Sequence, residues 1–342
     1  MSILDQEILN LQGNSWTVRD AACGTMCFGM TGSGKSSGPL RSIALRFLEL
    51  KFGGIVFCAK PDECETWEGY ARETGRSNDL IKLSRETFAF LNYELERPQE
   101  AGGGQIENVV GIFLEVTKIG KDKRNGSTND EYWQNAIKQF LRNTISLLLM
   151  AGEAITLPNI KQTIDTTIKK SAVAEGLKKY FKEFRGYCAQ YRDMEFYRRQ
   201  DSTGYEEILN RFEEEYKKNN GDVLNAELLN AAHEYSSTLI SKAIYYGKCS
   251  GPDYELGFNY FLTEFPQLDE RTRSNTISSF TVLADSMLRG EFLRCFGAPE
   301  SSFRLESLYR EGKILIVDQD VKRYGLVGQI TAAIIKLCFE RM

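Results

Sequence analysis

Residues Gly29 to Ser36 have the types and the spacing of a phosphate-binding loop. They form the pattern Gly-x4-Gly-Lys-Ser, written Gly-Met-Thr-Gly-Ser-Gly-Lys-Ser in this chain. Glycines let successive backbone N–H groups curl around an anion, and the lysine adds a mobile positive charge toward the β- and γ-phosphates. A serine hydroxyl at the last position ligates Mg²⁺ in such loops. The pattern therefore predicts binding of ATP and Mg²⁺, with Ser36 as the metal ligand and Lys35 as a catalytic residue.

The predicted nucleotide-binding set extends one position past the motif, because Ser37 is expected to cap the loop or to contact the α-phosphate. The set is Gly29, Met30, Thr31, Gly32, Ser33, Gly34, Lys35, Ser36 and Ser37. Pro39 follows closely, lacks a backbone N–H, and stands at the limit of where a first helical turn tolerates proline. We expect it to leave phosphate binding intact.

The segments around the loop are typical of an α/β fold. Thr25–Phe28 is a short β-prone run, and apolar side chains from Leu40 to Leu48 recur at helical spacing. Ile55–Ala59 follows as a buried strand. This succession of strand, loop, helix and strand predicts a parallel βαβ unit with a right-handed crossover. The context favours a phosphate site over a chance glycine turn.

The pattern of the chain changes twice. A third strand is predicted at Leu80–Leu83, but from Thr156 onward only helices are expected until the apolar strand in Gly312–Asp318. The predicted domains are therefore the N-terminal part of a P-loop NTPase core (1–155), an all-α insertion (156–300) and a return to the core (301–342).

Hydrolysis needs an acidic residue at the end of a neighbouring strand to hold Mg²⁺, and usually a carboxylate that polarises the attacking water. Asp318 follows four apolar residues in Ile-Leu-Ile-Val-Asp, but its neighbour is Gln319, so the usual Asp-Glu pair is missing. Two hypotheses stay open. Asp318 is the Walker B carboxylate, or it only ends a core strand.

Composition excludes several other classes of protein. The eight cysteines form no Cys-x-x-Cys pair and His233 is the single histidine, which argues against a zinc site and against a histidine-dependent catalytic triad. A net charge of -4 excludes a strongly basic, histone-like protein. The first residues lack the basic and apolar regions of a signal peptide, and the longest apolar run, Ile145–Ala151, is too short for a bilayer span. We expect a cytoplasmic protein, whose membrane contact would be peripheral or through a partner.

Taken together, these segments resemble the type IV secretion coupling proteins, ATPases of the FtsK-like and HerA-like motors that drive DNA toward conjugation channels. The residues that carry the resemblance are Trp16–Asp20, Phe28–Gly38, Gly53–Glu63, Asn92–Glu94, Glu131–Trp133, Glu264–Pro266, Glu270–Arg273, Gly312–Asp318 and Tyr324–Gly325. Family members commonly begin with membrane helices, which these residues do not encode.

The resemblance implies a RecA-like core with a mostly parallel sheet and an inserted all-α domain. It implies a homo-oligomeric ring, a hexamer in related motors, with ATP between subunits, DNA in the pore, and secretion-channel or relaxosome proteins as partners. Arg271 and Arg273 become candidate arginines for a neighbouring subunit's site. In similar proteins the strand like Gly312–Asp318 precedes the Walker B strand, so the Asp-Glu pair is expected beyond Met342.

Two functions follow as expectations. One is a motor subunit that couples ATP hydrolysis to the translocation of DNA or nucleoprotein. The alternative is a nucleotide-dependent adaptor or docking module for secretion substrates, with little or no hydrolysis, which the missing Asp-Glu pair favours.

Residues 178–199 are a candidate nucleic-acid contact, since they hold seven basic and three acidic side chains with aromatic residues interleaved. Such a segment can follow a phosphate backbone and stack bases. The simpler interpretation, which we favour, is an amphipathic helix with its aromatic side chains in the core and its cations in solvent.

Overall fold

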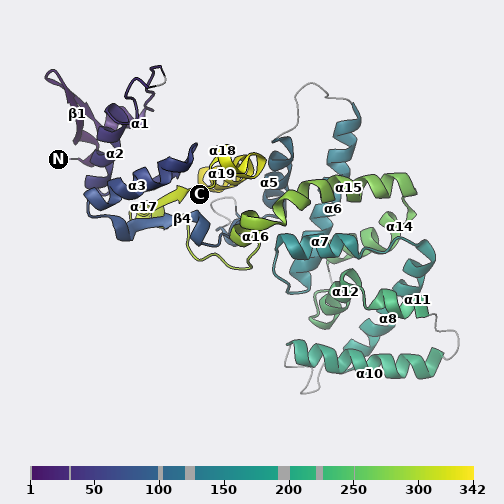
Figure 1. Cartoon of the computed structure of the whole chain (residues 1–342). Coiled ribbons are helices and arrows are strands. Elements are labelled where there is room, and N and C mark those ends of the chain that lie inside the picture. Colours follow the sequence, from purple (N-terminus) through teal and green to yellow (C-terminus); the bar gives the residue numbers. More distant parts are fainter. Residues whose placement is uncertain are drawn as a thin grey trace. The chain divides into compact units, whose positions relative to one another are not determined.

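The computed structural model describes residues 2–30, 32–98, 103–119, 128–191, 201–220, 226–249 and 251–342. They belong to two compact units (Figure 1). The sheet unit contains Met1–Thr87, Ser302–Glu340 and Met342, and the helical unit contains Phe88–Ser301 and Arg341. Residues 88–155, predicted as part of the P-loop core, thus belong to the helical unit.

Three short parallel strands organise the sheet unit. They are β3 (Gly54–Phe57), β4 (Leu80–Lys82) and β5 (Ile314–Val317), in the order β3-β5-β4. Ile314 of β5 is the register partner of both Gly54 and Leu80. All four residues of β5 are buried, as their unbroken apolar character predicts for a central parallel strand. The strands predicted at these three places are confirmed.

The remaining elements of the sheet unit are helical or belong to an antiparallel hairpin. The hairpin is formed by β1 (Glu7–Leu11) and β2 (Asn14–Thr17). The helices are α1 (Val18–Ala22), α2 (Pro39–Glu49), α3 (Pro61–Glu73), α17 (Ser307–Arg310), α18 (Val321–Tyr324) and α19 (Leu326–Glu340). Short 3₁₀ turns are η1 (Ile3–Asp5), η2 (Ser77–Asp79) and η3 (Leu83–Arg85).

The expectation of a RecA-like core with a mostly parallel sheet is wrong. The structure is 67% helical with only 6% strand, and its sheets have two and three strands. Thr25–Phe28, predicted as the strand that enters the loop, belongs to neither sheet. Strand geometry depends on a pairing partner and on burial, and here Phe28 is 84% exposed. The predicted βαβ unit therefore lacks its first strand.

Helices account for the helical unit, and they begin at Phe90, well before Thr156. In chain order they are α4 (Phe90–Glu96), α5 (Ile106–Lys118), α6 (Thr128–Met150), α7 (Leu157–Asp165), α8 (Ser171–Tyr191), α10 (Ser202–Asn220), α11 (Ala226–Ala232), α12 (Tyr235–Tyr245), α13 (Pro252–Asn259), the π-helical η6 (Tyr260–Glu264), α14 (Phe265–Gln267), α15 (Glu270–Met287) and α16 (Gly290–Phe296).

Buried aromatic rings from distant helices form the core of the helical unit. Phe140 of α6 stacks on Phe265 of α14 with ring centroids 4.9 Å apart. Tyr180 of α8 meets Phe212 of α10 edge to face at 5.1 Å. Such pairs contribute beyond the apolar area that they bury. None of the helices within the described ranges is both long and apolar enough to cross a membrane.

Arg76 holds the amino end of the parallel sheet together. Its side chain is 1% exposed, and its guanidinium donates to the backbone oxygens of Leu48, Phe52 and Gly312. Its Nε donates to Asp79 at 2.8 Å. These bonds join the ends of α2 and α3 to Gly312, two residues before β5, and the charge is neutralised within the same cluster.

Replacement of Arg76 by alanine is expected to destabilise the sheet unit by about 3–5 kcal/mol, because it leaves Asp79 and three carbonyls without their buried donor. The measurement is urea unfolding, and the control is Arg72→Ala, which removes an exposed arginine near the end of α3, four residues before Arg76. Equal stability of the two variants would contradict the role assigned to Arg76.

Candidate functional site

Lys35 closes the glycine loop on itself. Its ammonium donates to the backbone oxygens of Gly29 at 2.5 Å and Met30 at 2.7 Å. A Cβ atom at Gly29 would lie 2.5 Å from the Ser33 hydroxyl oxygen and 3.2 Å from the Cγ and Cδ atoms of Lys35. Any larger residue at position 29 would therefore crowd the Lys35 side chain in this conformation. The first glycine and the lysine of the motif are therefore parts of one arrangement, which fixes the cation at the mouth of the loop.

The middle of the loop has the backbone form of an anion-binding nest. Gly32 and Gly34 have φ angles of +80° and +82°, while Ser33 between them keeps an ordinary negative φ. Alternation of this kind turns successive N–H groups toward one side. In the described residues, no group accepts a hydrogen bond from the amides of the four residues Gly34–Ser37. These four donors are free for an anion.

Pro39 displaces the start of the helix that follows the loop. The helix α2 begins at Pro39 rather than at Lys35, and Gly38 is its N-cap. Because Pro39 has no N–H, the Lys35 carbonyl accepts instead from Leu40, at 3.1 Å. The dipole of α2 therefore begins later than in a helix that starts inside the motif, and the loop amides carry most of the anion-binding capacity.

Ser36 is exposed, and the structure shows no hydrogen bond to its hydroxyl among the residues it describes, which suits the predicted role in holding Mg²⁺. The Ser37 hydroxyl donates to the Gly34 oxygen at 3.4 Å. Thr31 lies outside the described residues. Within the described ranges, no cluster of His, Cys, Asp or Glu side chains could hold a metal by itself. The residues thus fit a metal that arrives with the phosphates.

The Asp318 carboxylate makes structural hydrogen bonds to Ser84. One of its carboxylate oxygens accepts from the Ser84 amide at 2.9 Å and the other from the Ser84 hydroxyl. These bonds hold η3 at the end of β4 against the end of β5. Of the two hypotheses for Asp318, the geometry favours a residue that ends a core strand.

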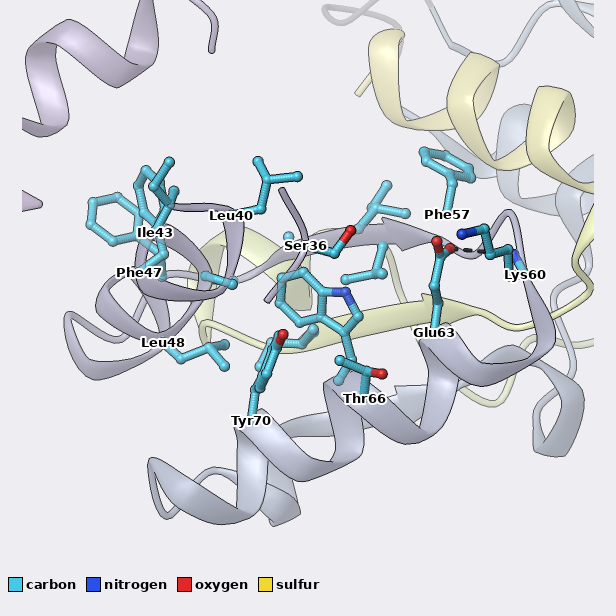
Figure 2. A pocket seen from close by; sticks show the side chains of 18 of the residues that line it. Ser36, Leu40, Ile43, Phe47, Leu48, Phe57, Lys60, Glu63, Thr66 and Tyr70 are labelled. Carbon is cyan, nitrogen blue, oxygen red and sulfur yellow. Dashed lines mark hydrogen bonds between the residues drawn. The ribbon is translucent and has the colours of Figure 1, made fainter. Parts of the chain in front are cut away.

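Two residues at the carboxyl end of β3 were not assigned a role from the sequence. Glu63 accepts from the amides of Ala59 at 2.6 Å and Lys60 at 3.3 Å, and so caps the start of α3 (Figure 2). Lys60 is exposed, and no ion pair of its ammonium is found in the described chain. The signal available in the sequence was Lys60-Pro-Asp-Glu63, a helix start with proline at its first position.

Burial, reinforced by nearby acidic groups, raises the pKa of the Cys58 thiol to about 12.

Arg271 and Arg273 lie at the start of α15 in the helical unit. Arg273 donates to the backbone oxygens of Pro266 at 3.2 Å and Leu268 at 3.3 Å, which satisfies carbonyls at the end of α14. Arg271 is exposed. The structure therefore gives Arg273 a local capping role and leaves the arginine-donor role of both residues a prediction.

The basic and aromatic stretch agrees with the simpler interpretation over residues 178–191. Tyr180, Phe181 and Phe184 are buried against other helices of the unit. Lys178 and Lys179 form ion pairs with glutamates on the same helix. These aromatic side chains cannot stack on bases. Residues 192–199 lie outside the described ranges.

Comparisons of the chain with protein-family models, with characterised proteins and with solved structures give no match.

The Asp318→Asn variant is expected to lose about 1–3 kcal/mol of stability and to keep its affinity for Mg·ATP, because the bonds to Ser84 weaken while the loop is untouched. Urea unfolding and calorimetric titration measure the two quantities. Ser84→Ala is the matched variant, and its stability loss should overlap with that of Asp318→Asn in the double variant. A variant with unchanged stability and no Mg-dependent nucleotide binding would restore the Walker B hypothesis.

Proposed function

We propose that residues 29–37 bind the phosphates of a nucleoside triphosphate with Mg²⁺. The observation that carries the proposal is the Lys35 ammonium, held by two backbone oxygens, beside a nest of four amides that have no acceptor among the residues that the structure describes. A triphosphate supplies both the charge and the oxygens that these donors lack. The Ser36 hydroxyl is available to the metal that accompanies the phosphates.

The described residues favour binding over hydrolysis. Asp318 accepts from Ser84, and Glu63 accepts from the amides at the start of α3. Neither carboxylate is therefore in position to polarise a water without breaking a bond that supports the fold. We propose a nucleotide-dependent adaptor or docking module with little or no hydrolysis of its own, and the resemblance to coupling proteins suggests secretion substrates as its cargo.

The second candidate is the ATP-driven DNA translocase that the resemblance implies. The observation in its favour is the segment that enters the loop, where Met26, Phe28 and Met30 are at least 77% exposed. Apolar side chains next to a phosphate site are suited to contact with a neighbouring subunit, which would then contribute the groups for hydrolysis.

The Lys35→Ala variant is expected to bind Mg·ATP about 10- to 100-fold more weakly, which is the range for loss of a charge-assisted hydrogen bond. Calorimetric titration measures the affinity. Lys169→Ala is the matched control, since Lys169 is an exposed lysine of the helical unit without an ion pair in the described chain. Equal affinity of wild type and Lys35→Ala would refute the proposed phosphate site.

Phosphate release with and without DNA separates the two candidate functions in the same preparation. The docking module predicts tight binding with negligible release in either condition. Release that rises on addition of DNA and is lost in Lys35→Ala would establish the translocase instead.

A further inference from the structure

An apolar groove of about 700 Å³ lies between α2 and α3, over the edge strand β3. Leu40, Ile43 and Phe47 line it from α2, and Trp67 and Tyr70 line it from α3. Figure 2 shows Leu40 and Ile43 on one side of Ser36, Lys60 and Glu63 on the other, and Tyr70 across the groove. The volume lies within the range of small-molecule sites in proteins.

The aromatic wall of the groove is ordered and only half buried. Trp67 and Tyr70 pack edge to face, with ring centroids 5.6 Å apart. The Arg41 guanidinium lies 5.9 Å from the centroid of Tyr70 on the α2 side, and its bonds to Glu73 at 2.6 and 2.8 Å hold it there. Trp67 also packs against the buried cluster of Cys58, Cys64 and Ile316, and the part of its ring that lines the groove is suited to stacking against a flat ligand.

The groove is continuous with the phosphate-binding loop. Ser36, the predicted Mg²⁺ ligand, also lines the groove, and Lys60 lines it with a cation that forms no ion pair in the described chain. The groove therefore presents the Ser36 hydroxyl of the proposed phosphate site and the Lys60 ammonium, with the carboxylates of Asp62 and Glu63 beside Lys60, and its walls present apolar and aromatic side chains. A ligand with an anionic end and a flat apolar end matches this distribution.

We propose that the groove receives the nucleobase of the nucleoside triphosphate whose phosphates are bound by residues 29–37, with Trp67 as the stacking residue. This inference rests on the proposed function and adds the ring-binding part of the same site. The Thr66 hydroxyl donates to its own helix, to the Asp62 oxygen at 2.9 Å, so the wall offers stacking more than hydrogen-bond recognition. The site should accept ATP and GTP with similar affinity.

The test compares Mg·ATP with inorganic tripolyphosphate, which has the phosphates but no ring, by calorimetric titration. Base–aromatic stacking corresponds to about 5- to 100-fold in affinity. Wild type is expected to bind ATP more tightly than tripolyphosphate by that factor. Trp67→Leu should lose this margin with unchanged affinity for tripolyphosphate, which also shows that its loop is intact. Trp16→Leu, the matched tryptophan control in the hairpin of the same unit, should keep the margin.

The failures of the two proposals are distinguishable. Equal affinity for ATP and tripolyphosphate in wild type, or an unchanged margin in Trp67→Leu, overturns the nucleobase groove and leaves the phosphate site standing. Absence of binding by both ligands overturns the phosphate site and the groove together.

Fluorescence gives a second measurement that leaves the groove unaltered. In a variant with Trp16→Phe and Trp133→Phe, Trp67 is the only tryptophan. Its emission is expected to be quenched by ATP and unaffected by tripolyphosphate. Emission that responds to protein concentration and not to ATP would assign the groove to a second copy of the chain and overturn the proposal.

Discussion

The buried guanidinium of Arg76 is the interaction on which the sheet unit depends. It bonds to carbonyls at the end of α2 and, 236 residues away in sequence, to the carbonyl of Gly312 just before β5. A parallel strand cannot reach its neighbour through a tight turn, so β5 must arrive from a remote part of the chain. The backbone pairing of β5 with β3 covers only four residues, and the bond from Arg76 to Gly312 adds a charged contact that holds β5 in place. Because the glycine loop precedes α2 at its other end, the position of the proposed phosphate site depends on this anchor.

The loop itself is largely self-contained. Its lysine, its glycines and its free amides are all within nine residues, and their geometry requires no strand before them. Catalysis is different, because it requires carboxylates brought by other elements. Here Asp318 and Glu63 hold η3 and α3 in place. Phosphate binding and hydrolysis therefore make separate structural demands, and the proposed function needs only the first.

Local signals in the sequence predicted individual elements correctly, although the fold class was wrong. The strands at Gly54–Phe57, Leu80–Lys82 and Ile314–Val317 were found because each contains a short apolar run, although only the central strand, Ile314–Val317, is fully buried. The helix α2 was predicted from the apolar spacing of Leu40 to Leu48. The predictions that were wrong concerned structure that depends on pairing with segments distant in the sequence. Thr25–Phe28 has strand propensity but no pairing edge, and a sheet of RecA-like extent was inferred from motifs that specify only a loop and its neighbours.

The same distinction applies to the site. Lys35 was identifiable because the motif is local, whereas the bond from Ser84 to Asp318 joins residues 234 positions apart and has no signature in the sequence. The groove beside Trp67 also depends on how α2 and α3 flank β3. In the sequence, the residues of α2 and α3 that line the groove look like the ordinary apolar positions of two separate amphipathic helices.

Hydrogen exchange at the amides of Gly34–Ser37 is the most direct test of the central claim, that these free donors bind a triphosphate. Exchange at these amides is expected to be fast in the free protein and slower when Mg·ATP or Mg·tripolyphosphate is added. Exchange at these four amides that stays fast at saturating Mg·ATP would contradict this claim.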